Sequence, residues 1–224
     1  FNPRRPGALT VEKVDATDET PLAGATFELY LDRDSDGAAG ASNDAPDPDD
    51  APAIESCTTG ADGTCSIGDL DFGDYYWFEV SAPEGYNLPD DRTSAVVTID
   101  AGNVDGELQV TGFADPRKPS TLTVLKLDKT SQEPLAGAEF DLVLDDGDGT
   151  YEPGVDDVVD SCTTGDAGTC SIGGLDFGTY FWVETAAPTG YDLPADPVSD
   201  PIVIDARRKT IDLANPRGIS LAVA

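Results

Sequence analysis

The feature that most constrains this chain is an internal repeat, in which long segments of the first half recur in the same order in the second half. The matching pairs are "PLAGATFELYLD" at 21–32 with "PLAGAEFDLVLD" at 134–145, "CTTGADGTCSIGDLDFGDY" at 57–75 with "CTTGDAGTCSIGGLDFGTY" at 162–180, and "WFEVSAPEGYNLP" at 77–89 with "WVETAAPTGYDLP" at 182–194. Repetition on this scale predicts two copies of one domain. We place the first copy at residues 1–118 and the second at residues 119–224.

Three versions of one junction flank these copies. They read "NPRRPGALTV" at the start, "DPRKPSTLTV" in the middle and "NPRGISLAVA" at the end. We therefore expect a fragment of a longer tandem array. In that interpretation residues 1–7 close a preceding module and residues 217–224 lead to a following segment.

Within each copy the segments are short, rich in Val, Thr, Tyr and Phe, and separated by Gly, Pro, Asn and Asp. This composition is typical of strands joined by tight turns, and no segment reads as a long amphipathic helix. We expect about six or seven antiparallel strands per copy, which is the pattern of a β-sandwich. The predicted fold class is all-β, with two tandem sandwich domains.

The net charge argues against polyanionic partners. The chain has 44 acidic residues against 13 basic ones, for a net charge of −31. Such a surface repels nucleic acid and anionic membranes. No apolar run reaches the roughly 20 residues of a membrane-spanning helix. We expect no nucleic-acid binding, no direct membrane contact and a monomer whose partners are neighbouring modules of the same chain.

The cysteines occur in two pairs of identical spacing, Cys57 with Cys65 and Cys162 with Cys170. Counting inward from the first pair leaves a three-residue turn, so the two sulfurs would face each other across a hairpin. A metal site is the competing interpretation, but it usually needs closer pairs and histidine, and the chain has 0 His. Two hairpin disulfides are favoured over free thiols, which implies an oxidising, extracellular compartment.

One charged residue falls on the apolar face of a predicted strand. In "LTVEKVD", side chains alternate between the two faces, so Leu9, Val11 and Lys13 share one face. "LTVLKLD" in the second copy places Lys126 in the same way. A buried, unpaired ammonium costs several kcal/mol, so each lysine needs a partner or a reaction.

Core-facing acids repeated in both copies are the candidate partners. Glu79 follows the aromatic run "YYWF", and Glu184 follows "YFWV". On the last predicted strand of each copy, alternation turns Asp115 and Asn215 inward. Each copy thus has a lysine on its first strand, a glutamate in its middle, and Asp or Asn on its last strand.

Burial of such a triad favours a neutral amine, which is a nucleophile, and a protonated carboxyl. Lys13 could then attack the side-chain carbonyl of Asp115 while Glu79 accepts and returns protons, and water would leave. In the second copy Lys126 would attack Asn215 with Glu184 in the same role, and ammonia would leave. The product is an intramolecular isopeptide bond. A salt-bridged triad without a bond is the alternative.

These residues lie in motifs that resemble a known family. "LTVxKxD", "PLAGAxF", "ExxAPxGY" and the terminal "NPR" or "DPR" are similar to Cna B-type domains, which are prealbumin-like and SpaA pilin-like modules of Gram-positive adhesins and pilins. The resemblance covers both copies. It implies spontaneous isopeptide bonds at the same two triads, no required cofactor, and a surface protein attached to the cell wall through parts outside this sequence.

Two function classes follow. The leading hypothesis is a structural stalk of an extracellular bacterial surface protein, self-cross-linked and pinned by disulfides. The alternative is an adhesive module that recognises a host extracellular-matrix protein or a glycan. An enzyme acting on an external substrate is not indicated, because the chain has 0 His and no G-x-S-x-G nucleophile motif.

Two aspartate-rich loops have the spacing of calcium ligands. "DRDSDG" offers Asp32, Asp34 and Asp36, although the EF-hand pattern fails at its twelfth position. "DDGDGTYEPGVDD" resembles the calcium-binding B repeats of staphylococcal surface proteins. Its candidate ligands are Asp146, Asp148 and Asp156. Asx turns in a solvated loop are the preferred interpretation of both stretches.

Overall fold

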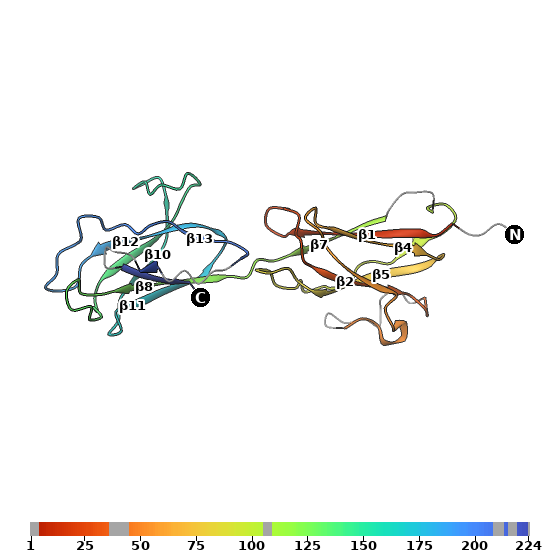
Figure 1. Cartoon of the computed structure of the whole chain (residues 1–224), viewed down its shortest axis with the longest axis horizontal. Helices are drawn as coiled ribbons and strands as arrows, with labels where there is room; N and C mark the ends of the chain where they lie inside the picture. Colours follow the sequence, from red (N-terminus) through yellow and green to blue (C-terminus); the bar gives the residue numbers. More distant parts are fainter. Residues whose placement is uncertain (1–4, 36–44, 105–108, 208–212, 215–218, 224) are drawn as a thin grey trace. The chain divides into compact units, whose positions relative to one another are not determined.

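The structure is a computed structural model that describes residues 5–35, 45–104, 109–207, 213–214 and 219–223. It divides into two compact units, Phe1–Arg117 and Lys118–Ala224, each built almost entirely of strands (Figure 1). The predicted all-β fold of two tandem sandwiches is confirmed. Among the described residues, no helix has the length and apolar character needed to cross a membrane.

Two sheets form the first unit. Its strands are β1 (Gly7–Asp15), β2 (Thr26–Leu31), β3 (Glu55–Thr58), β4 (Thr64–Leu70), β5 (Gly73–Ser81), β6 (Val97–Ile99) and β7 (Gln109–Asp115), with a short 3-10 helix η1 (Pro48–Asp50) before β3. One sheet has the order β4-β1-β7 and the other β3-β2-β5-β6. All described pairings are antiparallel except that of β1 with β7, which is parallel.

The core of the first unit lies between these sheets. Leu9 and Val11 of β1 pack with Phe27 of β2 and Trp77 of β5, and all four are fully buried. The rings of Phe27 and Trp77 meet edge to face, with centroids 6.3 Å apart. Each such side chain contributes about 1.5–3 kcal/mol of burial free energy. The alternating apolar pattern of the strands therefore faces inward, as predicted.

The second unit repeats this arrangement. Its strands are β8 (Ser120–Lys126), β9 (Glu139–Leu144), β10 (Asp157–Thr163), β11 (Thr169–Leu175), β12 (Gly178–Ala186), β13 (Ile202–Ile204), β14 (Leu213–Ala214) and β15 (Ile219–Val223). The sheets have the orders β10-β9-β12-β13 and β11-β8-β15-β14. Phe140 and Trp182 take the places of the aromatic pair above, with centroids 6.1 Å apart.

The two units differ at the strand beside their first strand. In the second unit this neighbour is β15, which pairs antiparallel with β8 from Ile219 opposite Lys126 to Val223 opposite Leu122. The proposed attack of Lys126 on Asn215 would require the last predicted strand to lie there, but Leu213–Ala214, just before Asn215, pairs with β15 instead. The sequence "ISLAV" alternates branched apolar and small residues, so it forms a good strand at this sheet edge. Asn215 lies outside the described residues.

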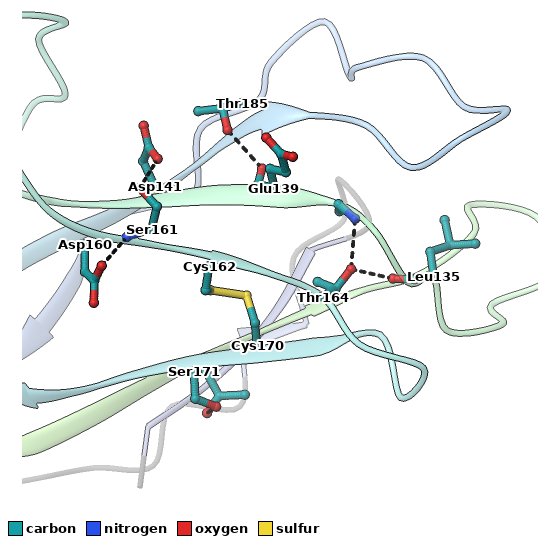
Figure 2. The surroundings of a disulfide bond; sticks show 12 residues. Leu135, Glu139, Asp141, Asp160, Ser161, Cys162, Thr164, Cys170, Ser171 and Thr185 are labelled. Carbon is teal, nitrogen blue, oxygen red and sulfur yellow. Dashed lines mark hydrogen bonds between the residues drawn. A yellow bond between two sulfur atoms is a disulfide. The ribbon is translucent and has the colours of Figure 1, made fainter.

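Both predicted disulfides are present, Cys57–Cys65 and Cys162–Cys170, each with Cα atoms 6.0 Å apart. The expected hairpin geometry was wrong. Cys57 lies on β3 and Cys65 on β4, and these strands belong to different sheets. Figure 2 shows the equivalent bond between β10 and β11.

The strands diverge because the second residue after the first cysteine of each pair, Thr59 or Thr164, is hydrogen-bonded to the loop that precedes the unit's second strand. The Thr164 hydroxyl donates to the carbonyl of Leu135 and accepts the amide N–H of Ala138. Each disulfide therefore ties one sheet of its sandwich to the other.

Candidate functional site: a buried lysine with two carboxyl groups

The predicted triad of the first unit comes together in its core. The Lys13 Nζ atom on β1 lies 2.7 Å from Glu79 Oε2 on β5 and 2.5 Å from Asp115 Oδ1 on β7. All three side chains have 0% exposure. The parallel register sets Lys13 opposite Phe113, so Asp115 is the next inward position along β7.

The surroundings of the triad are aromatic. The Lys13 Nζ atom lies 5.9 Å from the centre of the Phe27 ring and 5.6 Å from that of Phe113. Within the described part of the chain, Glu79 Oε1 and Asp115 Oδ2 have no hydrogen-bond partner. The site therefore holds charged or reactive groups in an apolar, water-excluding setting, where their mutual interactions are strong.

Burial changes the protonation of the two acids. It raises the pKa of Glu79 to about 7, an effect that Lys13 opposes. Burial also raises the pKa of Asp115, again against the influence of Lys13. A carboxyl group with such a pKa is partly neutral at physiological pH, so Glu79 can donate as well as accept a proton.

The arrangement permits one specific reaction. An amine nitrogen in contact with a carboxyl group is positioned for nucleophilic attack on its carbonyl carbon, and the folded core supplies the effective concentration. Glu79 touches the same nitrogen, so it can receive the proton that the amine must lose. No external substrate takes part.

A second polar cluster, not predicted from the sequence, lies next to the triad along β1 and β7. The buried carboxylate of Asp15 accepts hydrogen bonds from the Tyr86 hydroxyl at 2.8 Å and from Arg117 Nε at 2.6 Å. Asp15 lies two residues after Lys13 on β1, and Arg117 lies two residues after Asp115 on β7. The signal was present in the motifs "LTVxKxD", "APxGY" and "DPR", whose last residues meet here.

The described half of the second triad has the same geometry. Lys126 Nζ lies 2.5 Å from Glu184 Oε2, and the Glu184 side chain has 0% exposure. Lys126 is slightly more open, at 12% exposure. The third predicted member, Asn215, falls outside the described residues, so the cross-link in this unit stays a prediction.

The aspartate loops contain two groups of carboxylates. One oxygen each of Asp32, Asp34 and Asp50 lies within 4.8 Å of the others, and the same holds for Asp145, Asp146 and Asp148. Asp36 lies outside the described residues. Asp50 and Asp145 were not predicted as ligands from the sequence, because neither occupies a ligand position of the calcium-loop spacing.

Turns account for part of the second loop, as the preferred interpretation expected. Asp145 accepts the amides of Gly147 and Gly149. Asp156 is separate from the carboxylate group of this loop, and its two oxygens accept the backbone amides of Asp146 and Glu152.

Comparisons with solved structures found similar chains, two pilins among them. The Bacillus anthracis TIE protein is 21% identical, with 89% of this chain and 31% of that chain covered and a TM-score of 0.47. A streptococcal ancillary pilin is 23% identical, with 90% and 59% covered and a TM-score of 0.40. The shaft pilin SpaA of Lactobacillus rhamnosus GG is 21% identical, with 88% and 93% covered and a TM-score of 0.39. The chain thus spans less than two thirds of the length of the first two of these proteins.

A comparison with curated protein sequences found no match. One family model, described as SpaA, prealbumin-like fold domain, matches residues 7–112 and again residues 120–216. The two matches together cover most of the chain, with one match in each unit. Domains of this family are structural and non-enzymatic, which agrees with the prediction that the chain turns over no external substrate. The chain belongs to the SpaA prealbumin-like fold family and carries two such domains in tandem.

Proposed function

We propose that the chain forms two stalk modules of an extracellular, cell-wall-associated bacterial surface protein of the adhesin or pilin type. Each module is cross-linked by an intramolecular isopeptide bond, Lys13 to Asp115 in the first and Lys126 to Asn215 in the second. The contact of the buried Lys13 amine with both carboxyl groups carries the proposal. Membership of the prealbumin-like family supports a structural role.

The reaction balances without a cofactor. In the first module Nζ of Lys13 forms a bond to the side-chain carbonyl carbon of Asp115, the C–O bond of that carboxyl breaks, and water leaves. Glu79 takes a proton from the amine and returns it to the leaving oxygen. In the second module Glu184 does the same while the leaving group is ammonia. The glutamates act once, during maturation.

The topology makes this bond mechanically useful. It joins the first strand to the last across 102 residues of chain. Tension that enters through β1 passes through the bond into β7, so the strands between them bear no load. A link of that span also stabilises the module by roughly 4–5 kcal/mol in the chain-entropy model. Disulfides between the sheets fit the oxidising environment of a surface protein.

The intact mass of the purified chain, measured before and after reduction, tests the proposal. After reduction we expect a deficit of one water and one ammonia. Before reduction the two disulfides remove a further four hydrogens. Proteolytic fragments that join Lys13 to Asp115, and Lys126 to Asn215, locate the bonds. A reduced chain of full calculated mass would overturn the proposal and leave two sandwiches with buried ionic triads.

A further inference from the structure

The first cross-link needs one particular register between β1 and β7, which lie side by side (Figure 1). Lys13 is opposite Phe113 in this pairing, and it reaches Asp115 two residues further along β7. Because side chains alternate between the two faces of a strand, a slip of β7 by one residue would turn Asp115 out of the core. The reaction therefore depends on whatever fixes this register before the bond exists.

The strand β7 alone is weakly held. In the described part of the chain it pairs only with β1, because the sheet order is β4-β1-β7. Parallel pairs are slightly less stable per residue than antiparallel ones, and strand ends open readily. Asp115 is the last residue of β7, where such opening is greatest. Contacts beyond the strand are needed to keep this residue beside Lys13.

A second side-chain contact crosses the same two strands in the same way. Arg117 Nε lies 2.6 Å from Asp15 Oδ2, and these two residues are 102 apart in the sequence, as are Lys13 and Asp115. Asp15 is opposite Asp115, so each contact joins a residue of β1 to the residue two positions beyond its opposite number. A slip between the strands would break both contacts together. The ion pair thus fixes the register that the cross-link requires.

This ion pair belongs to a buried cluster of three residues, Asp15, Tyr86 and Arg117, which we call the Asp15 cluster. The Asp15 side chain has 1% exposure and that of Arg117 has 15%. Asp15 also accepts the Tyr86 hydroxyl at 2.8 Å and the amide of Thr17 at 2.7 Å. The second arm of Arg117 reaches Asp18 at 2.5 Å. Removal of the arginine would leave a buried carboxylate without its cation, which is far more costly than the loss of an exposed pair.

Backbone contacts anchor the same stretch of chain. The carbonyl of Asp115 accepts the amide of Ala16 at 3.0 Å, and the carbonyl of Pro116 accepts the amide of Asn87 at 2.9 Å. The segment that carries Asp115 is therefore tied to the end of β1 on one side and to the loop after β5 on the other. The Asp15 cluster joins the same three elements through side chains.

We propose that the Asp15 cluster positions the first cross-link: it holds the end of β7 in the register that brings Asp115 to Lys13 before a covalent bond joins them. This inference rests on the proposed function. The members of the cluster act through β7 and not on the reacting atoms, so they are positioning residues. Once formed, the bond fixes the register by itself, so the cluster controls how fast the bond forms.

The second unit repeats the described half of the cluster. Asp128 and Tyr191 take the places of Asp15 and Tyr86 in the repeated motifs. Hydrogen bonds from the backbone amides of the following turn lower the pKa of Asp128, and a hydrogen bond from Tyr191 adds to this effect. The counterpart of Arg117 lies outside the described residues. Substitutions in the first cluster leave all of these residues unchanged, so the second cross-link can serve as an internal clock.

The rate of bond formation in the full chain tests the proposal. The chain is made by cell-free synthesis, samples are quenched with acid at intervals, and the reduced mass is measured at high resolution. Loss of water reports the first bond, and loss of ammonia reports the second bond of the same molecule. Arg117→Gln should slow the water loss at least about tenfold, since a misplacement of 1 Å can cost about a hundredfold. The ammonia loss should keep its rate.

Two milder variants grade the effect. Arg117→Lys keeps the charge and one donor but loses the two-armed contact, so its water loss should be faster than that of Arg117→Gln and slower than that of the unsubstituted chain. Tyr86→Phe removes a single hydroxyl and should slow the water loss less than Arg117→Gln. It decides the test if Arg117→Gln does not fold.

Ile99→Ala separates positioning from stability. Ile99 on β6 is 3% exposed and packs in the same core, but the strand β6 pairs with β5 at Gly73, far along that strand from Glu79. The substitution leaves a cavity and so destabilises the first unit. At a temperature at which calorimetry shows the chains to be folded, its water loss should stay within about twofold of the unsubstituted rate, because distant sites act independently.

The possible failures are distinguishable. Unchanged water loss in both Arg117→Gln and Tyr86→Phe would overturn this inference and leave the proposed function intact. Equal slowing in Arg117→Gln and Ile99→Ala would do the same, because it would reduce the cluster to a general contribution to stability. An unsubstituted chain that loses no water would overturn the proposed cross-link of the first unit, and this inference with it.

Discussion

The Nζ atom of Lys13 and the Oδ1 atom of Asp115 lie 2.5 Å apart, although 102 residues separate them in the sequence. They meet because β1 and β7 are parallel neighbours with Lys13 opposite Phe113. A parallel pair cannot be closed by a hairpin and needs a long connection between its strands. Here that connection is the remainder of the sandwich, so a bond between the two residues encloses the whole domain.

Glu79→Gln and Glu184→Gln should each block one bond and leave the other. Glutamine keeps the shape of the side chain but cannot shuttle the proton. Because the leaving groups differ, the reduced mass identifies the bond that is lost. Glu79→Gln should retain only the ammonia deficit, and Glu184→Gln only the water deficit. Loss of both deficits, or of neither, in either variant would contradict the assignment of one glutamate to each module.

Loss of the first bond should destabilise only the first unit. In Glu79→Gln its free energy of unfolding should fall by roughly 4–5 kcal/mol, because the unfolded chain regains the entropy of a loop of about 100 residues. Calorimetry should show one of two transitions moving to lower temperature. The matched variant Glu184→Gln should move the other transition. A fall well below about 1 kcal/mol in both variants would argue that no covalent link had been removed.

The alternation of the first strand was enough to predict the buried lysine. Leu9, Val11 and Lys13 share one face because the period of a strand is fixed by its backbone. The burial of Glu79 was also predictable, because this acid lies within a strand of aromatic residues. The repeat supported both predictions, because the second copy has a lysine and a glutamate at the equivalent positions.

The structural features that could not be predicted from the sequence depend on the paths of the loops. Asp50 reaches Asp32 only because the connection between β2 and β3 folds back, and no short-range pattern encodes that return. The cysteine spacing predicted the correct pairs but not the divergence of β3 and β4 into separate sheets. The neighbour of β8 also differed, because two segments of strand-forming composition compete for one sheet edge.

The stability of the unbonded first unit should fall as pH rises from about 4.5 towards 7. Folding raises the pKa of Glu79 from 4.5 to about 7, chiefly by burial, so the folded state holds a proton that the unfolded state releases in this window. Asp115→Ala prevents the bond and keeps the burial of Glu79, which is the largest cause of its raised pKa, although it removes the smaller rise that Asp115 itself contributes. Its free energy of unfolding should therefore decrease over this range. Asp115→Ala combined with Glu79→Gln lacks the titrating group and should show no such decrease.

Removal of one disulfide should weaken its own unit modestly. The double substitution Cys57→Ala and Cys65→Ala should lower the free energy of unfolding of the first unit by about 2–3 kcal/mol, since the bond closes a short loop. The Cys162–Cys170 bond serves as the internal control. Urea titration should show one transition at lower denaturant and the other unchanged. A shift of both transitions would contradict the prediction that each disulfide stabilises only its own sandwich.

Arg117 should protect the first unit against acid through Asp15. Burial alone would raise the pKa of Asp15, but hydrogen bonds from Arg117, the Thr17 amide and Tyr86 outweigh it, and the net pKa is lowered. A lowered folded pKa contributes stability that is present above the unfolded value, about 3.9, and is lost as pH falls through the folded pKa. Arg117→Gln should therefore unfold at a higher pH than the unsubstituted chain.

The measurement can be confined to the first unit. The chain has 2 Trp, and Trp77 and Trp182 occupy equivalent core positions of the two units. In a Trp182→Phe background, Trp77 fluorescence reports acid unfolding of the first unit alone. Tyr86→Phe removes one neutral hydrogen bond to the same carboxylate and should give a smaller shift than Arg117→Gln. Equal midpoints in both variants and the background would show that these contacts do not hold the ends of β1 and β7 together.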